Sequence, residues 1–390
     1  MKRILVLDAN QRSALAVTRS LGRQNIPVFT AEETGIALAG CSRFSEQHFA
    51  YPSPSLYPEE FVDVLAQLVK KQHIDILLPM TELTTMLLLG NQNSFPGTEI
   101  PFPGISTVDS LVNKCSLMHM AESLNIPIPR TWYVENPDIL PCPLVELRYP
   151  VVFKPGKSWL RHQGQWTRFA VRFASNASGA KEILDADPAF RIHPFMIQEC
   201  VTGHGQGIFA LYNNGVPLAF FAHRRLREKP PGGGVSVLSE SVSVDPVLCS
   251  YARSLLNKAG WHGIAMVEFK VATDGTPYLM EINTRFWGSL QLAIDAGVDF
   301  PFMLYQLTSG IQPTAVGKYR TGIRLRWLLG DIDSLYLTLR DRSCHIRDKL
   351  EAVLRFLSPS PFKTRHEVDR WGDLRPFWFE LRQYARDILR

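Results

Sequence analysis

Two alternating apolar runs around an Asp-Gly pair constrain this chain more than any other feature of its sequence. The runs cover residues 267–272 and 277–282, and Asp274 and Gly275 lie between them. An Asp-Gly pair between such runs is the strongest short-range signal for a β-hairpin. The chain is therefore expected to fold back here as two antiparallel strands.

The register of the expected hairpin follows from its turn. With the Asp-Gly pair at the loop tip, Thr273 pairs with Thr276, and counting outward one residue at a time places Glu268 directly opposite Glu281. A four-residue loop gives the same register. Directly opposed like charges destabilise a sheet, so these two carboxylates ask for a compensating cation.

Asn283 and Arg285 extend the polar face of this hairpin. Asn283 lies two residues after Glu281, on the same face of the pleat, and Arg285 follows on that face. Carboxylate and amide oxygens suit a hard ion such as Mg²⁺. Together with a guanidinium they are what a triphosphate with bound magnesium requires. The alternative is an ordinary solvent-facing hairpin edge with charged side chains, which is common.

The same residues resemble a known signature. Glu268, the run Glu281-Ile282-Asn283 and Arg285 are similar to the magnesium-binding signature of the ATP-grasp superfamily. This superfamily of ligases includes carbamoyl phosphate synthetase, biotin carboxylase and D-alanine ligase. The resemblance implies an α/β fold in which a Rossmann-like pre-ATP-grasp domain precedes an ATP-grasp domain of two lobes that clamp ATP. A helical extension would follow at the C-terminus.

Length and composition set the broad class of protein. With 390 residues, of which 45% are hydrophobic and 20% charged, the chain is typical of a soluble protein of two or three domains. The net charge of +5 does not by itself argue for nucleic acid and suits an enzyme with anionic substrates. We therefore expect small-molecule substrates, with neither nucleic acid nor a membrane as partner.

The cysteines and the first residues indicate a cytoplasmic protein. The six cysteines show neither CxxC nor Cys/His spacing, so neither a disulfide framework nor a zinc site is indicated. The first apolar run ends at Asp8 and is too short for a signal sequence or a membrane span. We therefore expect a cytoplasmic location with reduced thiols.

Hydrophobic periodicity predicts the first elements. The pattern indicates strands at 4–7, 28–30 and 74–79 and helices at 13–21, closed by Gly22, and 58–72. A βαβ opening of this kind predicts a parallel sheet, and its connecting turn has no glycine fingerprint, which disfavours a dinucleotide site. The stretch 96–104 contains Pro and Gly and suits a boundary. The expected domains are 1–105, 106–312 and 313–390.

Two lysines resemble the nucleotide lysines of the superfamily. Lys114 begins a helix that Asn113 is suited to cap, ahead of an Asn-Ile-Pro-Ile-Pro segment, and Lys154 ends an apolar strand at 149–155. A cation at a strand end is well placed to meet phosphate. The resemblance implies that both lysines hold the nucleotide phosphates, whereas a lone lysine at a helix start is more often inert.

The segment after Lys154 departs from the family pattern. At 156–170 the resemblance implies a lid loop over the phosphates. Instead of several Gly and Ser residues, this segment carries Trp159 and Trp166, with glycine only at 156 and 164. These side chains do not favour a backbone cradle for the phosphates.

Residues 195–203 resemble the strand that passes between the two lobes. The resemblance implies that Gln198, Glu199 and Val201 bind adenine, chiefly through backbone groups around the last two. Gln206 aligns by spacing with a ribose-contacting position that is often acidic in the family, and a glutamine can hydrogen-bond ribose hydroxyls. The alternative for this stretch is a core strand followed by a glycine turn.

The basic segment 223–236 has two interpretations. It carries arginines at 224, 225 and 227 and a glycine run at 232–234. A loop of this composition is usually solvated. The family places a substrate and phosphate loop between these strands, which favours the other interpretation: Arg225 and its neighbours hold an anionic substrate while the glycine amides approach the phosphates.

Beyond about residue 314 the resemblance fades. Residues 322–328 alternate like a half-buried strand, and 331–390 are expected to form helices rich in Arg, Leu and aromatic residues. Basic amphipathic helices can contact nucleic acid or a membrane surface. A solvated face on packing helices is the commoner case.

The resemblance implies ATP-dependent ligation through an acylphosphate, with ADP formed. Glu268, Glu281 and Asn283 would bind one or two Mg²⁺ ions, which Mn²⁺ can replace. Arg285 would stabilise the transferring phosphoryl group, and Arg225 would act on the substrate. The expected substrates are a small-molecule carboxylate and an amine, and a homodimer is the assembly to test. Two alternatives stay open: a kinase-like phosphotransferase on the same fold, and a non-catalytic regulatory module that binds ATP.

Overall fold

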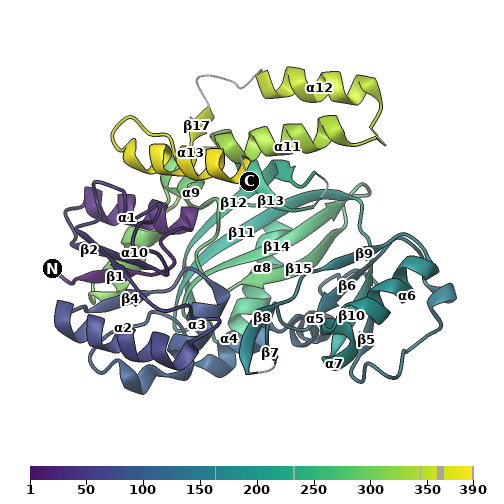
Figure 1. Cartoon of the computed structure of the whole chain (residues 1–390), viewed down its shortest axis with the longest axis horizontal. Coiled ribbons are helices and arrows are strands. Elements are labelled where there is room, and N and C mark those ends of the chain that lie inside the picture. Colours follow the sequence, from purple (N-terminus) through teal and green to yellow (C-terminus); the bar gives the residue numbers. More distant parts are fainter. Residues whose placement is uncertain (163, 232, 343, 358–363, 389–390) are drawn as a thin grey trace.

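The computed structural model describes residues 1–162, 164–231, 233–342, 344–357 and 364–388. Within these residues the strands form sheets of four, four, seven and two strands. Figure 1 shows the N-terminal sheet and its helices at the lower left and a small antiparallel sheet at the lower right, with the long strands of the largest sheet in the centre. The predicted α/β class is confirmed.

The N-terminal sheet is parallel, as the βαβ pattern predicts. Its strands lie in the order β3-β2-β1-β4. The elements are β1 Ile4–Val6, α1 Arg12–Arg23, β2 Val28–Glu32, β3 Gln47–Ala50, α2 Pro58–Gln72, β4 Ile76–Leu78, α3 Glu82–Gly90 and the 3₁₀ turn η1 Gln92–Ser94. Every residue of β1 and β4 is buried, as expected for parallel strands that are covered on both faces.

Helix α1 does not end at Gly22, as the sequence pattern predicts. It continues to Arg23, and the chain leaves the helix at Gln24. A Cβ on Gly22 would lie 2.5 Å from the Cβ of Phe44. Glycine at this position therefore allows a neighbouring segment to pack closely on the helix rather than marking the end of the helix.

The second sheet is antiparallel, with the order β5-β10-β6-β9. This part of the chain contains α4 Ile105–Val112, α5 Lys114–Ser123, β5 Thr131–Val134, η2 Leu144–Glu146, β6 Val151–Pro155, β9 Arg172–Ala174, α6 Ala177–Ala186, α7 Ala189–Ile192 and β10 Phe195–Glu199. The rings of Phe153, Phe190 and Phe195 pack against one another in its core. Between β6 and β9, a separate hairpin forms from β7 Trp159–His162 and β8 Gln165–Arg168.

The seven-stranded sheet has the order β15-β14-β11-β12-β13-β16-β17, so the predicted hairpin lies at one edge. Its elements and the helices between them are β11 Gly203–Asn213, β12 Val216–Lys229, β13 Val235–Val242, α8 Pro246–Lys258, β14 Gly263–Ala272, β15 Pro277–Asn283, α9 Leu290–Ala296, α10 Phe300–Thr308, β16 Arg324–Arg326 and β17 Thr364–His366. The strands from β15 to β16 pair antiparallel, and β17 pairs parallel with β16.

Two predicted segments differ from the structure. Residues 223–229 are not a loop: they continue β12 and pair with β13, because acidic partners on neighbouring elements neutralise their basic side chains. Only residues 230–234 connect the two strands, and Gly232 lies outside the described residues. The C-terminal part is not only helical, since β17 adds to the free edge of β16, whose backbone groups would otherwise lack partners.

The C-terminal part lies on the seven-stranded sheet and the N-terminal domain. Its helices are α11 Leu328–Arg340, α12 Ile346–Leu357 and α13 Arg375–Ile388, at the top of Figure 1. Arg227 of β12 holds α11 through a two-pronged pair with Asp331, in which both N–O distances are 2.6 Å. No described helix is both long and apolar enough to cross a membrane.

A buried ion pair joins the two ends of the chain. Arg19 of α1 is fully buried, and its Nε donates to Oδ2 of Asp373 over 2.8 Å. The other guanidinium nitrogens donate to the carbonyl oxygens of Glu367, Val368 and Asp373. Because every arm of the guanidinium is hydrogen-bonded, the charge is tolerated in the interior.

The Arg19–Asp373 pair generates a stability prediction. Asp373→Asn leaves a buried guanidinium without its counter-charge and should lower the free energy of unfolding by about 3 kcal/mol. Glu351→Gln removes one partner of the exposed Arg355–Glu351 pair and should cost less than about 1 kcal/mol. Thermal and urea unfolding followed by circular dichroism compare the two variants. Equal losses would contradict the importance of the buried pair.

Candidate active site

The hairpin of β14 and β15 places Glu268 directly opposite Glu281, as predicted. Its turn differs from the predicted two-residue tip. The Ala272 amide donates to the Thr276 carbonyl over 2.9 Å, three residues form the loop, and Gly275 has a φ of +89°. This is a three-residue hairpin loop with a left-handed glycine. A shift of register next to Glu268 then restores the predicted pairing of the two glutamates.

Arg225 supplies a cation beside the two carboxylates. Its Nη2 donates to Oε2 of Glu268 over 2.5 Å, and its Nη1 donates to Oε1 of Glu228 over 3.3 Å. Asn283 contacts the other carboxylate, with its Nδ2 3.1 Å from Oε1 of Glu281. The sheet therefore brings two carboxylates, a carboxamide and a guanidinium together on one face.

The two opposed glutamates differ in proton affinity. Burial and the neighbouring charge of Glu281 raise the pKa of Glu268 to about 7, although Arg225 opposes the rise. Burial also acts to raise the pKa of Glu281, but the charges of Lys114 and Lys154 outweigh it and hold this pKa below its usual range. At neutral pH the site therefore combines one ionised carboxylate with one that is partly protonated.

Lys114 and Lys154 approach Glu281 from two other elements. Lys114 is the first residue of α5, which the side chain of Asn113 caps as predicted. Its Nζ donates to Oγ of Ser158 over 3.1 Å. Lys154 lies in β6, where burial lowers its pKa to about 8 and the charge of Glu281 opposes the shift. Both lysines therefore contribute positive charge to the space in front of the hairpin.

The residues expected at the adenine site lie at the end of β10. Gln198 is buried, its Nε2 donates to Oγ1 of Thr131 over 2.9 Å, and its Oε1 accepts no hydrogen bond from a described residue. The Glu199 amide donates to the carbonyl of Arg130, and Val201 follows the strand. Because β10 pairs with β6, these residues share a sheet with Lys154.

Gln206 does not lie on the face that carries Glu268. In the pairing of β11 with β14, Gly207 is opposite Glu268 and Gln206 is opposite Phe269. Successive residues of a strand point to opposite faces. The amide of Gln206 contacts Nε2 of His204 over 3.1 Å. The register therefore places Gln206 on the face of the sheet opposite to that of Glu268.

Arg285 lies near a carboxylate that the sequence analysis did not identify. Burial lowers the pKa of Arg285, and the charges of Glu82 and Glu281 oppose the shift. Glu82 is the first residue of α3, directly after β4 and the capping residue Thr81. Ligands of open parallel sheets bind at the carboxyl ends of the strands. An acidic residue at a strand-to-helix junction was therefore the available signal.

Residues 156–170 form the hairpin β7–β8 instead of an irregular lid loop. The Trp166 amide donates to the carbonyl of Ser55 over 3.0 Å, and Arg161 pairs with Glu59 of α2. Trp159 and Trp166 also pack against the large hydrophobic core. The bulky side chains that replace the expected glycines and serines thus dock this hairpin on the N-terminal domain.

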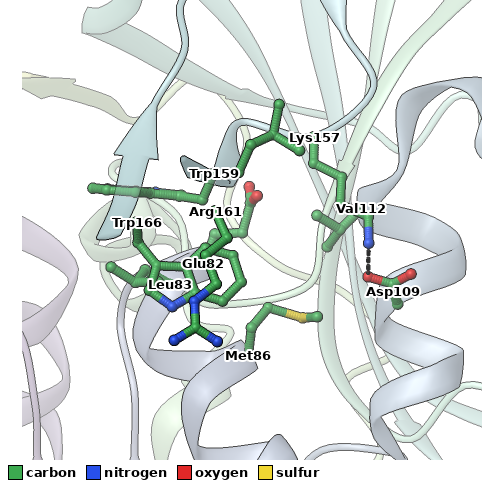
Figure 2. A pocket seen from close by; sticks show the side chains of 10 residues that line it. Glu82, Leu83, Met86, Asp109, Val112, Lys157, Trp159, Arg161 and Trp166 are labelled. Carbon is green, nitrogen blue, oxygen red and sulfur yellow. Dashed lines mark hydrogen bonds and ion pairs between the residues drawn. The ribbon is translucent and has the colours of Figure 1, made fainter. Parts of the chain in front are cut away.

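A cavity of about 220 Å³ lies beneath this hairpin. Figure 2 shows the two tryptophans on one side of it and Val112, Lys157 and Asp109 on the other. Glu82 also lines the cavity, so it connects this space to Arg285.

A second cavity, of about 760 Å³, lies between the seven-stranded sheet and helices α11 and α12. Arg225 lines it, so this space also reaches the paired carboxylates. The other members of the basic run have other partners: Arg224 pairs with Glu240 of β13, and Arg227 and Lys229 pair with Asp331 and Asp333 of α11. Of these residues, Arg225 is the one that joins the predicted site.

The donors on the hairpin fit a hard divalent cation. The described residues contain no group of three or more His, Cys, Asp or Glu side chains able to hold a metal. A metal here therefore depends on the amide oxygen of Asn283 beside Glu268 and Glu281. Mg²⁺ is commonly bound through one or two carboxylates. Burial and the charge of Glu281 both raise the pKa of Glu268, and a divalent cation between the two carboxylates would neutralise their negative charge.

The raised pKa of Glu268 predicts a pH dependence of stability. When the folded-state pKa of a carboxyl group lies above its ordinary value, the folded state binds the proton more tightly than the unfolded state. The stabilisation is then present at low pH and is lost as pH rises through about 7. Glu268→Gln should therefore lose less stability than the wild type between about pH 5 and 8 without divalent cations. Thermal unfolding in EDTA measures this, and parallel pH curves would refute it.

The comparison with family models matches the centre of the chain. The family described as ATP-grasp in the biosynthetic pathway with Ter operon matches residues 192–330. The matched segment contains the β14–β15 hairpin and β12 with Arg225. A comparison with curated protein sequences finds no match.

Solved structures share the fold over most of the chain. L-amino acid ligase from Bacillus licheniformis is 15% identical, with 83% of this chain and 78% of that chain covered and a TM-score of 0.63. The biotin carboxylase domain dimer of Hydrogenobacter thermophilus 2-oxoglutarate carboxylase, in complex with MgADP, ADP and bicarbonate, is 13% identical, with 83% and 73% covered and a TM-score of 0.61. N5-carboxyaminoimidazole ribonucleotide synthetase from Thermotoga maritima is 17% identical, with 83% and 79% covered and a TM-score of 0.58. This chain therefore has the ATP-grasp fold, and its residues 192–330 match an ATP-grasp family model.

Proposed function

We propose that this chain is an ATP-dependent ligase that activates a small-molecule carboxylate as an acylphosphate, with ADP formed, and condenses it with an amine. One observation carries the proposal: the carboxylate pair Glu268 and Glu281 lies among four cationic side chains from different parts of the fold. These are Lys114, Lys154, Arg225 and Arg285. The cations suit the phosphates of a nucleoside triphosphate, and the two carboxylates suit its magnesium ion.

Lys114 and Lys154 would hold the nucleotide phosphates. Lys154 has a pKa of about 8 because burial disfavours its charge. A phosphate beside it would favour the charged form, since a nearby opposite charge raises the pKa of a lysine. Lys154 is therefore suited to respond to the bound nucleotide. Lys114 is anchored by Ser158, which belongs to the segment that leads into the β7–β8 hairpin.

The end of β10 would hold the adenine ring. Gln198 and Glu199 end β10 of the antiparallel sheet, and Val201 lies in the short segment that leads from β10 to β11 of the seven-stranded sheet. Backbone groups at the end of a strand can recognise a flat base by hydrogen bonding. The ribose role expected for Gln206 is not part of the proposal, because the register places this residue on the other face of the sheet.

Glu268, Glu281 and Asn283 would hold one or two Mg²⁺ ions, with Mn²⁺ as a substitute, and the bound metal would neutralise phosphate charge. In the structure, Arg225 neutralises Glu268 directly. Once Glu268 has another cationic partner, the guanidinium of Arg225 is free to hold an anionic group of the substrate. This role agrees with the position of Arg225, which lines the second cavity and also contacts the carboxylate pair.

Arg285 would stabilise the charge that develops during both steps. In the first step, a carboxylate oxygen of the substrate attacks the γ-phosphorus and ADP leaves. In the second, the amine nitrogen attacks the acyl carbon, phosphate leaves with the bonding electrons, and the nitrogen loses a proton. A fixed guanidinium near the transferring phosphoryl group lowers the barrier because it needs no reorganisation.

The β7–β8 hairpin would protect the acylphosphate from water. Such an intermediate is hydrolysed if water reaches it, and closed sites prevent this side reaction. The hairpin is already docked on the N-terminal domain through Trp166 and Arg161. Its tryptophans would therefore shield the site from water, whereas a glycine-rich loop would bind phosphate through its backbone.

Two alternatives are separated by the product. A kinase-like phosphotransferase would leave phosphate on the acceptor, whereas a ligase releases it. A regulatory module would bind ATP without turnover, but such a module has no need of both glutamates and Asn283. The similarity of the fold to an L-amino acid ligase supports the ligase proposal. The dimeric, MgADP-bound biotin carboxylase domain supports a test for a homodimer and for Mg²⁺ dependence.

The proposal also keeps the expected setting: a cytoplasmic enzyme with small-molecule partners. The experiment that tests the activity measures ADP and phosphate release from ATP and Mg²⁺ with pooled carboxylates, with and without pooled amines. Mass spectrometry identifies the products. Release that requires both pools, with a new mass equal to their condensation, supports ligation. A stable phosphorylated acceptor supports the kinase-like alternative instead.

Glu281→Gln tests the role of the hairpin in turnover. The variant keeps the size of the side chain and removes a charged ligand, so the fold should persist while ADP formation falls by at least about a hundredfold. Glu122→Gln is the control, because Glu122 is an exposed carboxylate that pairs with His119 and has no role in the proposed site. Circular dichroism checks folding. Undiminished turnover in Glu281→Gln would remove the proposed metal site.

A further inference from the structure

We infer that the cavity beneath the β7–β8 hairpin is the pocket for the amine substrate, and that it selects a primary amine carried on an apolar, flat or branched body. This inference rests on the proposed ligase function and names the substrate class of one half of that site. Its parts are the carboxylate of Glu82 and the apolar walls formed by the residues that Figure 2 labels, Trp159, Trp166, Leu83, Met86 and Val112.

The charges that line the cavity leave one carboxylate without a directly paired cation. Lys157 pairs with Asp109, with 2.6 Å between Nζ and Oδ1, and Arg161 pairs with Glu59 over 3.4 Å. Among the ion pairs of the described residues, none joins Glu82 to a cation. Its carboxylate is instead hydrogen-bonded to the side chain of Ser158. A ligand ammonium can therefore take the position of the missing partner.

The walls of the cavity determine the rest of the ligand. Trp159 and Trp166 come from the hairpin, Leu83 and Met86 from α3, and Val112 ends α4. Aromatic and aliphatic walls favour an apolar body, and tryptophan faces also attract a neighbouring cation. The volume of about 220 Å³ equals roughly seven water molecules in the liquid. The ligand is therefore a small molecule such as an apolar amino acid or an arylalkylamine.

The position of Glu82 links the cavity to the chemistry. The electrostatic neighbours of Glu82 are Lys114, Arg285 and Glu281, the residues proposed to surround the transferring phosphoryl group. Lys114 donates to Ser158, and Ser158 in turn contacts Glu82. When nucleotide phosphates pair with Lys114 and Arg285, these two cations no longer compensate the charge of Glu82. The carboxylate of Glu82 can then bind the ammonium group of a ligand. An amine held there lies beside the proposed acylphosphate.

The inference is tested by binding in the presence of Mg²⁺ and a non-hydrolysable ATP analogue, so that the phosphates are in place and the result does not depend on turnover. Isothermal titration calorimetry on the full chain compares 2-phenylethylamine with its neutral analogue 2-phenylethanol and its anionic analogue 3-phenylpropanoate. The amine should bind at least about tenfold more tightly than the alcohol, because one charge-assisted hydrogen bond is added. Tighter binding of the anion, or no binding of any of the three, would overturn the inference.

Variants assign the selectivity to Glu82. Glu82→Gln should bring the amine-to-alcohol ratio close to one while leaving the affinity for the alcohol nearly unchanged. Trp166→Leu should weaken both ligands to a similar extent, since the wall contacts both. Glu60→Gln is the matched control: this exposed carboxylate of α2 lies outside the cavity lining and is not the partner of a lining residue in any ion pair of the described residues, so the ratio should stay as in the wild type. A ratio unchanged in Glu82→Gln would overturn the assignment.

The two proposals fail in different ways. Amine selection that depends on Glu82, together with no ADP release from any substrate pool, removes the ligase proposal and leaves an amine-binding pocket. If the chain ligates an amine and Glu82→Gln does not alter the amine preference, the pocket assignment is wrong and the ligase proposal stands. Each outcome therefore decides one proposal independently of the other.

Discussion

The direct opposition of Glu268 and Glu281 across the β14–β15 hairpin is the constraint on which the site depends. Burial raises the pKa of Glu268 to about 7, and repulsion by Glu281 at the paired position adds to the rise. Such a pair is tolerated only if cations surround it. The fold supplies these from the same sheet through Arg225, and from α5 and β6 through Lys114 and Lys154. Stability and the proposed chemistry therefore depend on the same charges.

Several separate elements of the fold bring charged side chains to the carboxylate pair. The antiparallel sheet brings Lys154, helix α5 brings Lys114, and the N-terminal domain adds Glu82 close to Arg285. The hairpin β7–β8 then closes the space between the antiparallel sheet and the N-terminal domain with two tryptophans. On the other side, α11 and α12 lie against the sheet near Arg225. Two cavities thus approach one charged centre from different directions, which suits two different substrates.

Local sequence patterns predicted much of this structure, but they could not predict contacts between segments that are distant in the sequence. The Glu268–Glu281 pairing was predicted because side-chain alternation and an Asp-Gly turn fix it locally, although a three-residue loop and a register shift cancel to give it. The predicted end of α1 at Gly22 was wrong. Glycine is common just after the end of a helix, but here it allows Phe44 to pack closely on the helix. The strand character of residues 223–229 was missed in part because the acidic partners of Arg227 and Lys229 lie about one hundred residues later, in α11. Glu82 was missed for a similar reason, since its partners come from other domains.

The central claim is that the hairpin holds a divalent cation beside nucleotide phosphates. Anomalous diffraction from crystals grown with Mn²⁺ and a non-hydrolysable ATP analogue tests it most directly. We expect an anomalous peak within coordination distance of oxygens of Glu268, Glu281 and Asn283, with the phosphates next to Lys114 and Lys154. A bound nucleotide without metal at these three residues, or metal bound at another place, would contradict the account.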